Sequence, residues 1–192
     1  MSKTIYIVLT ETGSWLSRAI QLYTQENFNH VSIAFDSELK EMYSFGRKFE
    51  NNPFIGGFVK EDVRSRLFRN ANCAIYQCQV TEEQYDHLRQ EIQYFDLHKE
   101  KYKYNFIGLI GVACRIRLKR SYAFFCSQFI ATIFMNAGIS IDGQCPYFTK
   151  PTDFAKWAWM QPCYQGPLRH YVFLPRTAPM PNIPIRTIGK IA

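Results

Sequence analysis

The chain lacks the features that mark several whole classes of protein. Its apolar runs all stay short of the roughly 18 residues that a membrane-spanning helix needs. The first ten residues, MSKTIYIVLT, contain neither a long apolar segment nor a small-residue cleavage site, so they do not resemble a secretory signal. Internal repeats and low-complexity segments are also missing. These absences predict a cytoplasmic protein rather than a membrane-spanning, secreted or repeat protein.

Paired metal ligands are missing as well. The sequence has 6 cysteines, but no two of them form a CxxC pair, and no pair of histidines is spaced to complete a zinc site. In a reducing compartment such cysteines remain free thiols. We therefore expect no metal and no cofactor.

The composition is that of a folded protein with a mild excess of positive charge. Hydrophobic residues make up 47% of the 192 residues and charged residues 20%, which predicts one domain over residues 1–175, followed by an extended, proline-containing tail over 176–192. The net charge of +7 is scattered, and its densest run is CRIRLKR at 114–120. We interpret this run as a solvated face. It is compatible with peripheral contact with a membrane, and nucleic acid is not an expected partner.

Hydrophobic periodicity predicts an α+β domain with an antiparallel sheet. Alternating or β-rich runs predict strands at 4–10, 73–80 and 169–175, and a hairpin over 30–46 that turns at 36–38. Helical spacing and capping residues predict helices at 14–25, from 81 onward, within 104–118, from 126 to a stop at Gly138, and from 151. The Gly-, Asn- and Pro-rich stretch at 46–63 is interpreted as a long ordered loop.

One thiol lies at the start of a predicted helix. Cys126 opens the run CSQFIATIFMNAG, whereas the other cysteines fall in predicted strands, mid-helix or loops. A helix N-terminus carries partial positive charge and unbonded N–H groups, which favour a thiolate and can also hold an oxyanion. A buried structural cysteine is the alternative interpretation, and the pattern alone favours it.

A nucleophilic cysteine needs a base, and His30 is the best placed of the 4 histidines. His87 and His98 lie on a polar helix, and His170 has no polar companions nearby in the sequence. His30 begins an apolar strand, from which it can face a neighbouring helix.

The two segments FNHVSIAFDSELKEMYSFG and FFCSQFIATIFMNAG, in this order and about ninety residues apart, resemble the circularly permuted branch of the NlpC-type papain-like hydrolases, the YiiX-like group. PYFTKPTDF also resembles the segment that follows the cysteine helix in that branch. The resemblance covers roughly residues 4–160. It implies a papain-like fold, Cys126 as nucleophile, His30 as general base, and hydrolysis or acyl transfer at an amide or ester through an acyl-enzyme.

The resemblance also implies a third polar residue on the strand after His30. If the hairpin turn centres on Ser37, Ser44 lies opposite His30 and shares its face. Glu41 is the stronger chemical candidate, but it falls on the other face unless the register slips by one residue. We favour Ser44 and keep Glu41 as the alternative.

Weaker candidates concern the substrate. Tyr122 can lend a hydroxyl to the site, although core packing is the favoured interpretation, and Arg47 can bind an anionic group. The substrate class stays open between a cell-wall-type peptide, an acyl lipid and an isopeptide. A non-catalytic module that binds anionic lipid or nucleic acid on the same fold is the alternative function, and the reactivity of Cys126 discriminates between the two.

Overall fold

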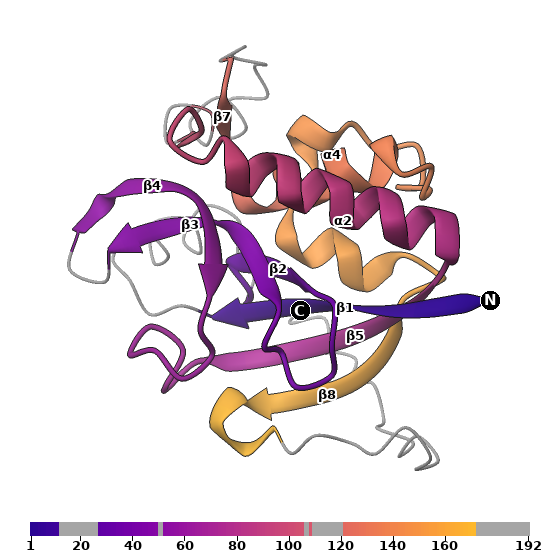
Figure 1. The fold of residues 1–192 in the computed structure, drawn as a ribbon. Helices are drawn as coiled ribbons and strands as arrows, with labels where there is room; N and C mark the ends of the chain where they lie inside the picture. The colour runs from indigo at the N-terminus through magenta and orange to yellow at the C-terminus, as the bar shows by residue number, and fades with distance from the viewer. Residues whose placement is uncertain (12–26, 50–51, 106–107, 109–120, 172–192) are drawn as a thin grey trace, which may run out of the picture.

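The fold is built on one six-stranded antiparallel sheet with helices on one side (Figure 1). The structure is a computed structural model that describes residues 1–11, 27–49, 52–105, 108 and 121–171. The strands run in the order β4-β3-β2-β1-β5-β8. Their bounds are β1 Ser2–Glu11, β2 His30–Ala34, β3 Met42–Phe49, β4 Asn52–Glu61, β5 Asn72–Thr81 and β8 Gln161–Pro167. The predicted α+β class with an antiparallel sheet is confirmed.

Two helices lie side by side over this sheet (Figure 1). Helix α2 spans Glu82–Leu97 and begins at the predicted capping box, in which Thr81 accepts a hydrogen bond from the Gln84 backbone N–H. Helix α4 spans Cys126–Asn136. It ends as predicted at Gly138, which has φ +68° and donates its N–H to the carbonyl of Met135.

Short elements complete the described part of the chain. Strands β6 Lys103–Tyr104 and β7 Ala123–Phe124 form a separate parallel pair that leads directly into α4. Three 3₁₀ helices follow α4, at Pro146–Phe148, Pro151–Lys156 and Leu168–His170.

The two faces of the sheet carry separate cores because strand side chains alternate between faces. Ile5, Ile7 and Leu9 of β1 pack with the buried faces of α2 and α4, around an aromatic cluster that includes Phe45 and Phe129. The opposite face holds a smaller core, whose buried residues are Val8, Ala34, Leu39, Met42, Phe68, Ala71, Cys73, Ile75, Cys163 and Leu168.

The interpretation of residues 46–63 as a loop is wrong. Strand β3 continues to Phe49, and β4 pairs with it from Asn52 onward, with Met42 opposite Glu61. The glycines that suggested a loop are needed because another segment passes close to the strand. A Cβ at Gly56 would lie 2.8 Å from the Tyr104 Cβ, and one at Gly57 would lie 2.6 Å from the Tyr102 carbonyl oxygen.

Other predictions fare unevenly. The strands predicted at 4–10 and 73–80 are confirmed and extend to the full lengths of β1 and β5. The last strand of the described residues is β8, and the first part of the strand predicted at 169–175 is instead a 3₁₀ turn at 168–170, while 172–175 lie outside the described residues. The helix from 151 is a 3₁₀ helix. The predictions for 14–25, for most of 104–118 and for the tail at 176–192 lie outside the described residues.

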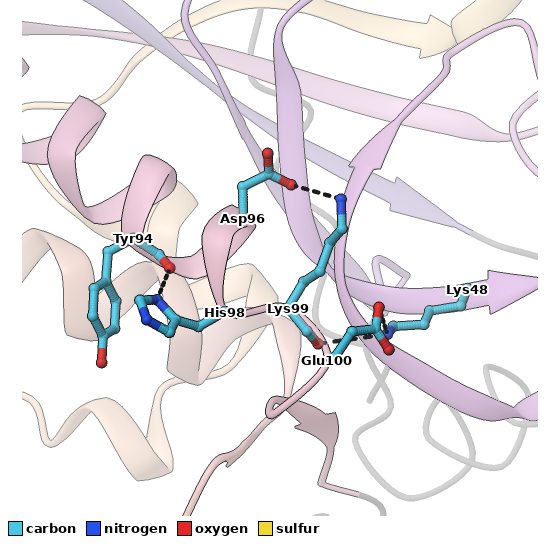
Figure 2. A network of polar contacts seen from close by, with 6 residues as sticks. All are labelled: Lys48, Tyr94, Asp96, His98, Lys99 and Glu100. Carbon is cyan, nitrogen blue, oxygen red and sulfur yellow. Dashed lines mark hydrogen bonds and ion pairs between the residues drawn. The ribbon is translucent and has the colours of Figure 1, made fainter.

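Polar contacts fasten the end of α2 to strand β3 (Figure 2). Lys48 Nζ of β3 lies 3.3 Å from Glu100 Oε1, and Lys99 Nζ lies 3.2 Å from Asp96 Oδ1. The His98 ring bonds the Tyr94 carbonyl oxygen through Nδ1 at 2.8 Å. The predicted surface position of His98 agrees with this arrangement. Among the described residues, no helix combines the length and apolarity needed to cross a membrane.

Candidate active site

Cys126 is the first residue of α4, as predicted. The preceding residue, Phe125, is extended (φ −106°, ψ 166°), and no side chain of the described residues caps the helix start. The first backbone N–H groups of α4, near Cys126, therefore have no capping side chain among the described residues. The partial positive charge of the helix N-terminus lies at the same place. Cys126 is buried, with 3% of its surface exposed. The thiol thus lies where developing negative charge is stabilised.

His30 lies beside this thiol. It is the first residue of β2, pairs with Thr10 of β1, and keeps 11% of its side chain exposed. Burial lowers the pKa of His30, but the negative charge of Glu61 and side-chain interactions with Cys126 and Glu61 outweigh it and raise the pKa to about 10. The structure therefore brings together His30 and Cys126, the two residues that the sequence paired. It favours the protonated form of the His30 imidazole.

Glu61, the last residue of β4, holds the imidazole from its other side. Its Oε1 lies 2.8 Å from His30 Nε2, and its side chain is 5% exposed. Because Nε2 faces Glu61, Nδ1 is the nitrogen left to face the thiol. A carboxylate in this position orients the ring and stabilises the imidazolium that forms when the ring takes a proton.

Two serines complete the surroundings of Glu61. Ser44 donates a hydrogen bond to Oε1 at 2.8 Å, and Ser32 donates to Oε2. The Ser32 hydroxyl also lies 3.3 Å from His30 Nε2. Burial alone raises the pKa of Glu61, but the charge of His30 and the hydrogen bonds from His30 and both serines lower it below its usual value. Glu61 is therefore held as a carboxylate although it is buried.

The sheet register gathers these four polar residues on one face. Ala34 pairs with Met42, and Met42 pairs with Glu61, so alternation places His30, Ser44 and Glu61 on the same side of three adjacent strands. The space is tight: a Cβ at Gly46 would lie 3.3 Å from both Glu61 Oε1 and Ser44 Oγ. A buried polar cluster of this kind is stable only when its members satisfy one another.

The third residue differs from the prediction. Ser44 lies on the face of His30, as expected, but the hairpin register is shifted by two residues, so that Ile33 pairs with Tyr43. The hydrogen bonds of the described residues connect Ser44 to Glu61 rather than to the imidazole. Ser44 thus contacts the His30 ring only indirectly, through the Glu61 carboxylate.

Glu41, the alternative, lies outside this cluster. It forms a partly exposed ion pair with Arg89 of α2, in which Arg89 Nη2 lies 3.4 Å from Glu41 Oε1. Its assignment to the site is therefore corrected. The carboxylate that contacts the His30 ring is that of Glu61. Sequence reasoning missed Glu61 because its strand was interpreted as loop. A signal for a strand was available after the glycine pair Gly56–Gly57. Val59 and Glu61 are two residues apart, so in a strand they share one face.

Tyr104 is the second residue that the sequence did not single out. It belongs to β6, pairs with Phe124 two residues before Cys126, and packs against the main core. Burial raises the pKa of Tyr104 well above its ordinary value, and the charge and hydrogen bonding of Cys126 raise it further. A neutral phenol therefore lies beside the thiol.

The weaker candidates from the sequence are Tyr122 and Arg47. Tyr122 is 58% exposed and has a positive φ of 59°, so the favoured interpretation as a core aromatic is wrong. Its ring lies 5.7 Å from that of Tyr102. Arg47 is a strand residue of β3 rather than a loop residue.

Neither the models of known protein families nor the curated proteins give a match to this chain. Within the described residues, no cluster of three or more His, Cys, Asp or Glu side chains could hold a metal ion. Five cysteines of this part of the chain are free thiols, namely Cys73, Cys78, Cys126, Cys145 and Cys163.

Ser44 and Glu41, the two candidates for the third residue, should differ in how much their removal lowers the free energy of unfolding. Replacing Ser44 by alanine removes a hydrogen bond to a buried carboxylate, so we expect the free energy of unfolding to fall by about 1.5–3 kcal/mol. Replacing Glu41 by alanine breaks a partly exposed pair and should cost at most about 1 kcal/mol. Urea denaturation measures both. A larger loss in Glu41→Ala than in Ser44→Ala would contradict the arrangement described above.

Proposed function

We propose that the protein is a thiol-dependent hydrolase or acyltransferase that acts on an amide or ester bond. The observation that carries this proposal is the placement of His30 between Cys126, at the start of a helix, and the buried carboxylate of Glu61. A nucleophile, a base that contacts it and a group that orients the base are the three parts that covalent catalysis requires.

The proposed reaction follows from these positions. His30 holds the proton that the Cys126 thiol has given up, and the Cys126 sulfur bonds the substrate carbonyl carbon while the π electron pair moves onto the oxygen. When the carbonyl re-forms, the leaving group departs with its electron pair, and an amine leaving group takes the proton from His30. Water or another acceptor then attacks the thioester, with His30 taking its proton, and the cysteine is released.

The order of the elements supports the resemblance to the circularly permuted papain-like hydrolases. The histidine strand precedes the cysteine helix in the chain, and an antiparallel sheet carries the histidine and its carboxylate. We include this fold in the proposal. Small peptides and acyl lipids are the substrates proposed, because they carry the amide and ester bonds that a thiol nucleophile attacks.

The test compares two cysteines within the same folded protein. Cys126 is buried, whereas Cys145 is a more exposed free thiol. If His30 activates Cys126, iodoacetamide at pH 6.5 alkylates Cys126 first in spite of its burial. p-Nitrophenyl acetate should in addition release p-nitrophenolate in a burst and leave an acetyl group on Cys126, which peptide mass spectrometry detects.

The opposite result is equally clear. Faster labelling of Cys145 and no acetyl group on Cys126 would show that the thiol is structural, and the enzymatic proposal would fail. Because both cysteines are measured in one sample, differences in folding or reagent concentration do not affect the comparison.

A further inference from the structure

We propose that a hollow between α2 and α4 binds a small ligand that carries a methylated ammonium group. The hollow has a volume of about 620 Å³, which suits a small organic molecule. The described residues that line it do not include Cys126, His30 or Glu61. The inference therefore goes beyond the proposed function and does not depend on it.

Aromatic rings form the inner part of the hollow. Phe95 and Tyr102 are buried, Phe124 is half-buried, and Tyr94 is exposed over 49% of its surface. The rings of Tyr94 and Tyr102 are inclined at 68° with their centroids 6.4 Å apart, and those of Phe95 and Phe124 are inclined at 89°. Figure 2 shows the Tyr94 ring beside that of His98, at 4.5 Å between centroids. Rings at such angles form walls rather than a flat stack, and the electron-rich face of an aromatic ring attracts a cation.

A carboxylate lies at the same hollow. Asn136 of α4 donates a hydrogen bond from Nδ2 to Glu91 Oε1 of α2 at 2.9 Å, which holds the carboxylate between the two helices. Among the described residues that line the hollow, Glu91 is the only acid, and none is a lysine or an arginine. Burial raises the pKa of the Tyr102 hydroxyl above its ordinary value, so this ring is a neutral phenol. Glu91 thus supplies the counter-charge for a bound cation.

The helix that carries Glu91 is acidic although the chain is basic. The chain has a net charge of +7, but α2 contains five acidic residues and one basic residue, namely Glu82, Glu83, Asp86, Glu91 and Asp96 against Arg89. The summed field of such a helix raises the local concentration of cations and lowers that of anions. A phosphate or a carboxylate ligand is therefore disfavoured at this hollow.

The aromatic walls select among cations. A bare ammonium is a compact charge that holds its water strongly, and aromatic rings do not replace the hydrogen bonds of that water. Methyl groups weaken the hydration of the ammonium and add apolar surface that packs against the rings. Choline is a simple ligand of this kind and serves as the probe.

Choline and its uncharged isostere 3,3-dimethylbutan-1-ol separate the effect of charge from that of shape. In saturation-transfer NMR titrations of the full chain, we expect choline to bind about tenfold more tightly than the isostere. Glu91→Gln should lower the affinity for choline by about tenfold and leave that for the isostere unchanged, and Tyr94→Leu should weaken choline binding by a similar factor. Glu83→Gln removes the same charge at an exposed position of α2 outside the hollow, and it should leave both affinities at the wild-type value.

Three outcomes would overturn the proposal. Equal affinities for choline and the isostere would show that the hollow selects apolar shape and not charge. Equal losses in Glu91→Gln and Glu83→Gln would show a diffuse attraction to α2 instead of a site, and no binding of choline at millimolar concentrations would show that the rings do not accept the group. These titrations do not involve the reactivity of Cys126, so their failure is distinguishable from failure of the proposed function.

Discussion

Replacing His30 by alanine is expected to lower the rate at which iodoacetamide alkylates Cys126 at pH 6.5 by about 10²- to 10⁴-fold. The reason is that the imidazolium and Glu61 together stabilise a thiolate at a pH where a thiol without a base stays protonated. An unassisted thiol has a pKa of about 8.5, so raising the pH to 9 should restore much of the alkylation in the variant. Rates measured across this pH range test the expectation.

Ester turnover should behave differently from alkylation in the same variant. Alkali can form the thiolate, but water that attacks the acyl-enzyme still needs His30 to take its proton, so turnover stays low at pH 9. His98→Ala provides the control, because that ring bonds a backbone carbonyl at the end of α2 (Figure 2). Equal effects of the two substitutions, or an alkylation rate in His30→Ala equal to wild type at pH 6.5, would remove the basis for the enzymatic proposal.

Replacing Glu61 by glutamine should cost the most stability of any change considered, about 3–5 kcal/mol of unfolding free energy, because it leaves a buried imidazolium without its counter-charge. The cost depends on pH. The pKa of His30 is raised to about 10, so its share of the stabilisation is complete below pH 6.5 and is lost as the pH rises toward 10. The pKa of Glu61 is lowered below 4.5, so its share is complete above pH 4.5 and is lost on further acidification.

The difference between wild type and Glu61→Gln is therefore expected to be largest between pH 4.5 and 6.5, and smaller near pH 10. Urea denaturation followed by circular dichroism at several pH values measures this difference. Glu41→Gln, at a partly exposed ion pair, should change stability by no more than about 1 kcal/mol throughout. A loss in Glu61→Gln that is constant with pH would show that shape and packing, not charge, account for the role of Glu61.

The parts of the site that could be predicted from the sequence are those with a local signal. Cys126 begins an amphipathic helix, and His30 begins an alternating strand, so each residue is marked by its own neighbours. The hairpin also carries such a signal, and a register error of two residues left Ser44 on the correct face because side chains alternate with a period of two.

Glu61 and Tyr104 carry no comparable signal. Glu61 follows a glycine pair that favours a loop in any local interpretation, yet Gly56 and Gly57 lie in a strand because residues 102–104 pass against them. That contact joins segments more than forty residues apart, and it also places Tyr104 at the thiol. The positions of Glu61 and Tyr104 are set by packing between distant segments, and the hydrophobic pattern of a short stretch of sequence carries no information about that packing.

His30 and Glu61 belong to strands β2 and β4, which both precede the helix α4 that carries Cys126. A ribosome therefore releases His30, Ser44 and Glu61 long before Cys126 emerges. Domains fold as units, from the N-terminal side first during synthesis. Residues of α4 belong to the same core as the strands, so the surroundings of His30 are completed only when α4 packs on the sheet. A chain arrested before residue 126 lacks the cysteine of the proposed catalytic pair, so under the proposed function the growing polypeptide carries no complete active site until α4 has been made.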